Sequence, residues 1–132
     1  MRYKNEIYGE IAGKIWRALS VTGPCEEKNL LEKTGINKNE FYAGVGWLAR
    51  ENKIHKRGTT YQLGDTNLTN EIGTNAGKVW NTLNNTQDID VSTITKISHI
   101  TQKDAYSAIG WLAREDKIKT YTKDKILKFE LK

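Results

Sequence analysis

The sequence predicts a mainly helical α+β fold with small β-hairpins, built from two tandem copies of one unit. Each residue between Gly9 and Ile54 can be compared, without a gap, with the residue 64 positions further on, and seventeen of these forty-six pairs are identical. The unit of about 60 residues has helical spacing of apolar residues, then a marked helix start, then strand-like segments around a turn. We therefore expect two modules, at residues 1–65 and 66–132.

Each copy begins with an amphipathic helix. Apolar residues stand at positions i, i+3, i+4 and i+7 from Ala12 to Leu19, and the same spacing returns from Ala76 to Leu83. Such spacing places the apolar residues on one helix face. We expect Trp16 and Trp80, which belong to this set, to lie in the core. A shorter helix is expected next, over residues 27–34 and 91–98.

A longer helix follows a tight turn in each copy. Asn37-x-x-Glu40 and Thr101-x-x-Asp104 match the capping box, in which side chains and backbone at the helix start satisfy each other's hydrogen bonds. The helix is expected to end near residue 51 in the first copy and residue 115 in the second. His99 stands where the first copy has Gly35, and histidine tolerates the positive φ of such a turn better than most residues.

A hairpin closes each copy. Residues 53–63 are typical of a hairpin around Gly58, and residues 117–131 of a hairpin with a turn near residues 123–124. The second hairpin is the longer of the two.

The order helix, helix, tight turn, capped longer helix and hairpin resembles a winged helix-turn-helix. The strings IGTNAGKVW (72–80) and AIGWLAREDKI (108–118) are similar to a small, poorly characterised family of bacterial and archaeal winged helix-turn-helix proteins. The first copy carries looser versions, YGEIAGKIW (8–16) and GVGWLARENKI (44–54). The resemblance covers nearly all of both units. It implies a winged fold and double-stranded DNA as the partner.

Composition narrows the function classes. The net charge is +5 and the pI about 9.3, which suits a phosphate-bearing partner. Cys25 is the single cysteine, so no internal disulfide can form, and we expect it to be buried. No apolar leader or membrane-spanning run is present, so we expect a soluble, cytoplasmic protein. No nucleophile–base set, metal cluster or dinucleotide loop can be singled out. We expect no enzyme activity, cofactor or metal site.

A winged module would place its longer helix in the major groove of DNA and its hairpin against the backbone. The helix face opposite Val45 and Leu48 would then face DNA, with Lys and Arg on phosphates and polar residues on base edges. This reasoning nominates Lys38, Asn39, Ala43, Arg50, Gln102, Lys103, Ser107 and Arg114 on the helices, and Lys56, Arg57, Lys119, Lys123 and Lys125 on the hairpins. The alternative is an ordinary solvated face, and basic hairpin residues also protect edge strands from pairing.

The linker sets a geometric limit on such binding. The ten residues from Gly64 to Gly73 span at most ~35 Å, and half-sites one turn apart need ~34 Å between recognition helices. Under this hypothesis the chain is a covalent pseudo-dimer that acts as a transcriptional regulator. Its two modules would reach neighbouring sites only in a suitable mutual orientation.

A second hypothesis is a protein-interaction or adaptor module, because fold does not fix function. Small residues recur at Ala43-x-x-Gly46 and Ser107-x-x-Gly110, a spacing that suits close approach of two helices. Under this hypothesis Gly46, Trp47, Gly110 and Trp111 would contact either the other long helix or a partner.

Overall fold

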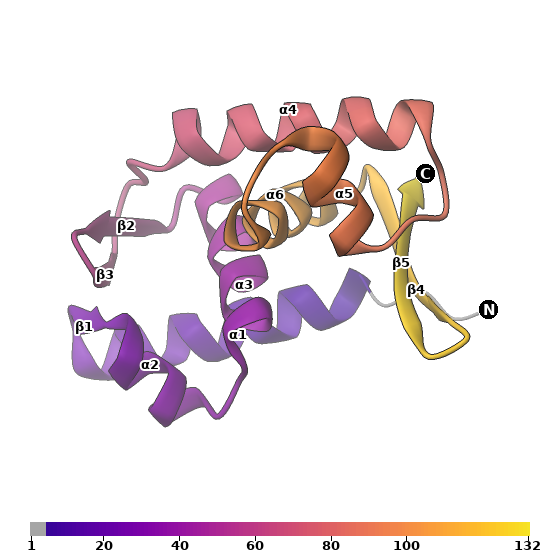
Figure 1. Cartoon of the computed structure of the whole chain (residues 1–132). Helices are drawn as coiled ribbons and strands as arrows, with labels where there is room; N and C mark the ends of the chain where they lie inside the picture. Colours follow the sequence, from indigo (N-terminus) through magenta and orange to yellow (C-terminus); the bar gives the residue numbers. More distant parts are fainter. Residues whose placement is uncertain (1–4) are drawn as a thin grey trace.

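Six helices and two small antiparallel sheets form the described part of the chain, residues 5–132, in the computed structural model (Figure 1). The first copy comprises α1 (Asn5–Thr22), β1 (Cys25–Glu26), α2 (Glu27–Thr34), α3 (Lys38–Arg50), β2 (Ile54–Arg57) and β3 (Thr60–Leu63). The second comprises α4 (Thr69–Asn85), α5 (Val91–Ser98), α6 (Gln102–Arg114), β4 (Ile118–Lys123) and β5 (Ile126–Leu131). The predicted mainly helical fold is confirmed.

The helix boundaries follow from local chemistry. The Asn37 side chain accepts a hydrogen bond from the Glu40 amide, and the Glu40 carboxylate accepts one from the Asn37 amide. Together these bonds form the capping box that starts α3. Thr101 accepts from the Asp104 amide at the start of α6. Gly35 and His99 both take left-handed φ values, of 70° and 56°, after α2 and α5. The turn therefore survives the replacement of glycine by histidine.

The sheets are the two hairpins. In the first copy β3 pairs with β2 on one side and with the two-residue strand β1 on the other, giving the order β1-β3-β2. In the second copy β4 pairs with β5, and only an isolated bridge between Ile89 and Phe129 takes the place of β1. Each strand of the second hairpin has six residues against four in the first.

A single hydrophobic core runs through both copies. α1 packs on α3, α4 packs on α6, and α3 and α6 pack on each other at the centre of the molecule. Fully buried side chains come from both copies, among them Ile15, Phe41, Ile109 and Phe129. Cys25 is buried as predicted.

The prediction that Trp16 lies in the core is wrong. Its side chain is 42% exposed, while its neighbour Ile15 is completely buried. Trp80, at the equivalent place in α4, is only partly buried. The apolar stripe is wider than the surface that α3 or α6 covers, so the tryptophan at its flank remains accessible.

Candidate nucleic-acid interface

The two long helices meet at their small residues. A Cβ atom built on Gly46 would lie 1.9 Å from the carbonyl oxygen of Ser107, and one on Gly110 would lie 1.8 Å from that of Ala43. The two contacts exchange under the 64-residue shift, so they are related by a pseudo-twofold. At these distances the backbone of one helix occupies the place of the missing side chain on the other. The glycines are therefore required by the contact between α3 and α6.

This contact corrects the predicted DNA-reading face. Ala43 is fully buried and Ser107 is 6% exposed, both between the two helices. Neither side chain can reach a base in this arrangement. Direct contact between α3 and α6 also contradicts binding at two major grooves about 34 Å apart. The sequence could not separate these alternatives, because a stripe of Ala, Ser and Gly suits a close helix neighbour as well as a close DNA backbone.

The C-terminal ends of α3 and α6 are joined by two equivalent ion pairs. Arg50 Nε lies 3.0 Å from Glu115 Oε2, and Arg114 Nε lies 3.0 Å from Glu51 Oε2. Arg50 also lies over the Trp111 ring and Arg114 over the Trp47 ring, at 5.7 and 5.9 Å from the ring centroids. Arg50 and Arg114, nominated for phosphate binding, thus have partners within the fold. Trp47 and Trp111 lie at the same junction.

The N-terminal ends of α3 and α6 also meet, and here polar residues remain accessible. Gln102 Nε2 donates to Asn39 Oδ1 at 3.2 Å, which links the two helix starts. Lys38 and Gln102 are exposed beside this bond. Lys103 lies 5.3 Å from the centroid of the Tyr42 ring. Two of the four predicted contact residues of each helix therefore lie together at one end.

The first hairpin adds basic residues to this end. Lys56 lies over the Tyr61 ring at 5.6 Å and shares a small depression with Lys103. Burial lowers the pKa of Lys56, and the neighbouring charge of Lys103 lowers it further. Arg57 follows on the exposed side of the strand. We call the set Lys38, Lys56, Arg57, Gln102 and Lys103 the N-terminal edge.

The lysines of the second hairpin are more dispersed. Lys123 pairs with Asp88 at 3.0 Å, which raises the pKa of Lys123, and Asp88 also accepts from the Tyr121 hydroxyl. Lys125 is exposed at the turn, with φ 67°. Lys119 is partly exposed on β4. The structure does not gather these three with the N-terminal edge into one cluster.

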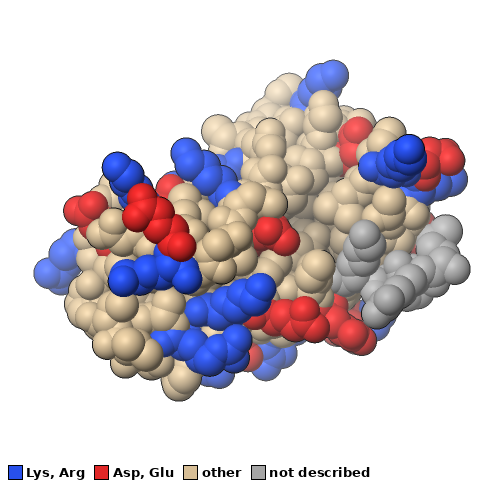
Figure 2. All heavy atoms as spheres, turned by 90° about the horizontal axis from the view of Figure 1, so that it is seen from below, with Lys and Arg blue, Asp and Glu red and all other residues tan. Residues whose placement is uncertain are grey.

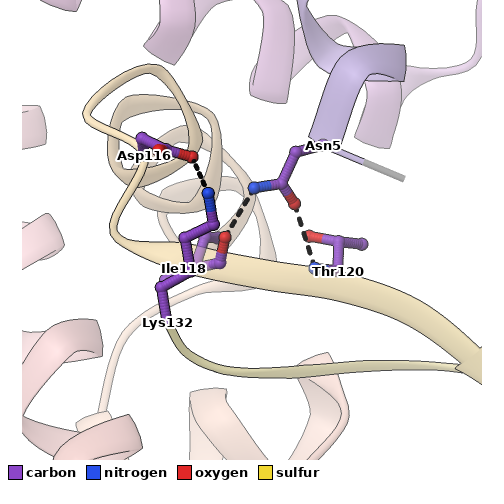
Figure 3. Close-up of polar contacts among 5 residues, drawn as sticks. All are labelled: Asn5, Asp116, Ile118, Thr120 and Lys132. Atoms are coloured by element: carbon purple, nitrogen blue, oxygen red, sulfur yellow. Dashed lines mark hydrogen bonds and ion pairs between the residues drawn. The ribbon is translucent and has the colours of Figure 1, made fainter. Parts of the chain in front are cut away.

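Each hairpin is held by an asparagine from the other copy. The Asn5 side chain donates to the Ile118 carbonyl at 2.5 Å and accepts from the Thr120 amide at 3.0 Å (Figure 3). In the same way Asn67 accepts from the Lys56 amide at 2.9 Å and donates to the Lys56 carbonyl at 2.6 Å. Lys56 and Thr120 are equivalent positions. These bonds fix each hairpin relative to the first helix of the other copy.

Charge on the surface is mixed. The face in Figure 2 shows most of its Lys and Arg side chains over one half, with Asp and Glu side chains among them. The whole-chain charge of +5 is therefore not concentrated in one uninterrupted basic field on that face.

Two equivalent grooves were not foreseen from the sequence. One, of about 530 Å³, lies between α1 and α3, and the other, of about 380 Å³, lies between α4 and α6. Their nine lining positions correspond one to one under the 64-residue shift, and only Arg17, replaced by Asn81, differs. Eight of the seventeen identical pairs thus line the grooves. The sequence feature that could have indicated them is the clustering of identical residues in the two segments AGK(I/V)W and GWLARE.

The groove glycines differ in their need for space. A Cβ atom on Gly9 would lie 3.0 Å from the Trp47 ring, so packing explains that glycine. On Gly77 it would meet nothing within 4 Å, and on Gly13 only the Arg17 side chain at 3.6 Å. A glycine inside a helix costs ~1 kcal/mol against alanine. Packing within the protein does not explain why glycine stands at positions 13 and 77.

Metal-ligating residues do not cluster in the described part of the chain: no group of three or more His, Cys, Asp or Glu side chains is placed to hold an ion there. Among the helices of residues 5–132, none has the length and apolar character needed to cross a membrane.

Comparison with known protein families agrees with this architecture. A family model described as "Winged helix-turn-helix domain (DUF2582)" matches the sequence twice, over residues 1–63 and 67–131. No curated protein and no solved structure matches the chain. The double match is the tandem repeat found in the sequence.

Proposed function

The chain belongs to the winged helix-turn-helix family DUF2582, and from this premise we propose that it binds duplex DNA through the N-terminal edge. The observation that carries the proposal is the Lys56–Lys103 pair. Two like charges share a depression there with the carboxylates of Glu71 and Asp104, and the pKa of Lys56 is lowered by burial and by Lys103, against smaller opposing effects of Glu71 and Glu27. A phosphate at the mouth of the depression, within reach of both ammonium groups, would relieve their repulsion and favour their charged forms.

The pairing of α3 and α6 makes this a single contact surface. Gln102 precedes Lys103 at the start of α6, and Lys38 precedes Asn39, the partner of Gln102, at the start of α3; they supply a side-chain amide and a third positive charge. Arg57 extends the surface along the first hairpin. In this mode the helix starts approach the DNA together, rather than each helix lying in a groove of its own. Phosphate contacts then dominate, and affinity depends strongly on salt.

We expect Lys56→Gln with Lys103→Gln to weaken duplex binding. Fluorescence anisotropy on a labelled duplex, repeated over a salt series, measures the affinity and its salt dependence. The parent chain should bind in the micromolar range or tighter at low salt. Loss of two phosphate contacts should reduce the slope of log K against log salt by about 2.

The matched control is Lys53→Gln with Lys117→Gln. It removes the same charge from the opposite ends of α3 and α6, where these lysines lie near Glu51 and Glu115. We expect the control to retain most of the parent affinity and slope. Equal losses in both variants would show that net charge alone drives binding, and absence of binding at low salt would refute the proposal.

A second candidate function, protein interaction, is favoured by the two equivalent grooves. Their identity between copies and the uncovered Gly13 and Gly77 suit two equivalents of the same apolar segment, packed beside Trp16 and Trp80. Aromatic side chains are enriched where protein partners bind.

Closing both grooves tests this second function. Gly77→Leu adds a side chain over open space and Gly13→Leu adds one beside the flexible Arg17 side chain, so we expect the double variant to keep the fold and lose partner capture. Gly13→Ala with Gly77→Ala is the control that adds little bulk. Affinity capture followed by mass spectrometry compares the variants, and circular dichroism checks the fold. If the leucine variant captures the same proteins as the parent, the grooves are not the binding surface.

A further inference from the structure

A cavity of about 280 Å³ lies where the two copies meet near the second hairpin. Its walls come from the first turns of α1 and α3, from Tyr106 on α6, and from Thr120 and Leu127 on the two strands of the hairpin. The Asn5 bonds to β4 stand at the same junction (Figure 3). The cavity is separate from the N-terminal edge lysines, which do not line it.

Two buried hydroxyl groups in the cavity wall have no hydrogen-bond partner beyond each other among the described residues. Tyr8 is 4% exposed and Thr120 is completely buried; the two hydroxyls interact with each other, and neither oxygen has another partner among the described residues. Burial raises the pKa of the Tyr8 phenol, with the neighbouring Thr120 hydroxyl acting in the opposite direction. The phenol therefore keeps its proton at neutral pH and can donate. The two hydroxyls carry two donors, and a bond within the pair uses only one, so one donor is left for a further group, as buried polar groups are nearly always satisfied in folded proteins.

The equivalent place in the other half of the molecule is filled. There Thr120 is replaced by Lys56 and Asn39 by Lys103, while Ile72 stands in place of Tyr8. The remaining space is only about 20 Å³. The same fold position can thus be filled by the chain's own side chains, and among the described residues the hydroxyl-lined copy is the one with the larger space.

The lining defines the chemistry that fits. Ile7, Leu127 and the Tyr106 ring supply apolar surface. Lys and Arg are absent from the described lining residues, and its one carboxylate, Glu40, accepts from the Asn37 amide in the capping box. Among the described lining residues an anion would meet Glu40 and no compensating positive charge, and a buried ion without a partner is unfavourable. A neutral group that both donates and accepts suits the two hydroxyls.

We propose that this cavity binds a small uncharged molecule with a ring-sized apolar body and one hydroxyl or amide group, which hydrogen-bonds Tyr8 and Thr120. The bound molecule would contact α1, α3, α6 and the second hairpin together, and so hold the two copies in one arrangement. The site is independent of DNA binding.

Four probes with the same ring test the charge and hydrogen-bond requirements. Benzyl alcohol and benzamide are neutral, benzoate is an anion and benzylammonium is a cation. Each is titrated into the full ¹⁵N-labelled chain at neutral pH while amide shifts are recorded. We expect the neutral pair to shift amides around Tyr8 and Thr120 with millimolar affinity, as befits probes of this size. We expect the charged pair to leave those amides unchanged.

The chain itself suggests the blocking variant. Thr120→Lys introduces the residue found at the equivalent Lys56 and should abolish the shifts by filling the cavity. Thr120→Val keeps the side-chain volume, removes the hydroxyl and should weaken benzyl alcohol binding about tenfold. Tyr8→Phe removes the other hydroxyl with a similar expected loss and keeps the test valid if the lysine variant does not fold.

Three results would overturn the proposal. The first is that no neutral probe shifts the amides that line the cavity. The second is that benzoate or benzylammonium binds there as well as benzyl alcohol does. The third is that Thr120→Val and Tyr8→Phe both retain the parent affinity, which would place the probes elsewhere.

Discussion

Gly46→Ala should destabilise the protein by about 3 kcal/mol or more, since the added methyl group would lie 1.9 Å from the Ser107 carbonyl oxygen. That oxygen belongs to the backbone of α6, so it cannot move aside as a side chain would. α3 and α6 would have to separate, with loss of packing along the centre of the core. Urea denaturation followed by circular dichroism measures the effect.

A matched control is available on α4. Gly77→Ala adds a methyl group where nothing lies within 4 Å, and alanine is favoured over glycine inside a helix by ~1 kcal/mol. We expect Gly77→Ala to raise the free energy of unfolding while Gly46→Ala lowers it. Equal urea midpoints for Gly46→Ala and the parent would show that α3 and α6 do not touch in solution.

A variant that combines Gly46→Ala with Gly110→Ala gives a further test of this contact. Gly110→Ala alone should cost as much as Gly46→Ala, because its methyl group would lie 1.8 Å from the Ala43 carbonyl oxygen. Once either substitution has separated the helices, the other has little further to disturb. The double variant should therefore lose less stability than the sum of the two single variants. Strict additivity would contradict a shared contact.

The parts of the fold that the sequence predicted are those decided within a few residues. The capping pair Asn37 and Glu40 marks the start of α3, because both partners lie in one turn. Asn52 and Asp116, directly after the long helices, both take the left-handed conformation, with φ 60° and 59°, which asparagine and aspartate tolerate better than most residues. β1 was missed, because a two-residue strand is defined only by its long-range pairing with β3.

The candidate site was less predictable, because residue type does not say what covers a helix face. Ala43 and Ser107 occupy positions that face outward from their own module, and the other module buries them. Lys38 and Gln102, at the helix starts, remain exposed because the close contact lies further along both helices. Position along the helix therefore decides which of the nominated residues can reach DNA.

Residues 1–65 alone should form a homodimer rather than a stable monomer. The contacts between the copies are related by the 64-residue shift, so a second first copy can supply most of them. Arg50 would pair with Glu51 of its partner, as Arg114 pairs with Glu51 in the full chain. Gly46 would meet the partner's Ala43 carbonyl, as Gly110 does here. A single copy would instead expose the face of α3 that is now buried.

Sedimentation equilibrium over a range of concentrations tests this expectation, with the full chain measured alongside for comparison. The half-chain should have twice its formula mass at high concentration, and its helical signal should fall as dilution dissociates it, because folding and association are linked. Gly46→Ala in the half-chain places a clash on both sides of the twofold and should abolish the dimer. A half-chain that stays folded and monomeric at all concentrations would show that each module is stable without the α3–α6 contact. The central glycines would then serve an arrangement of the modules rather than their folding.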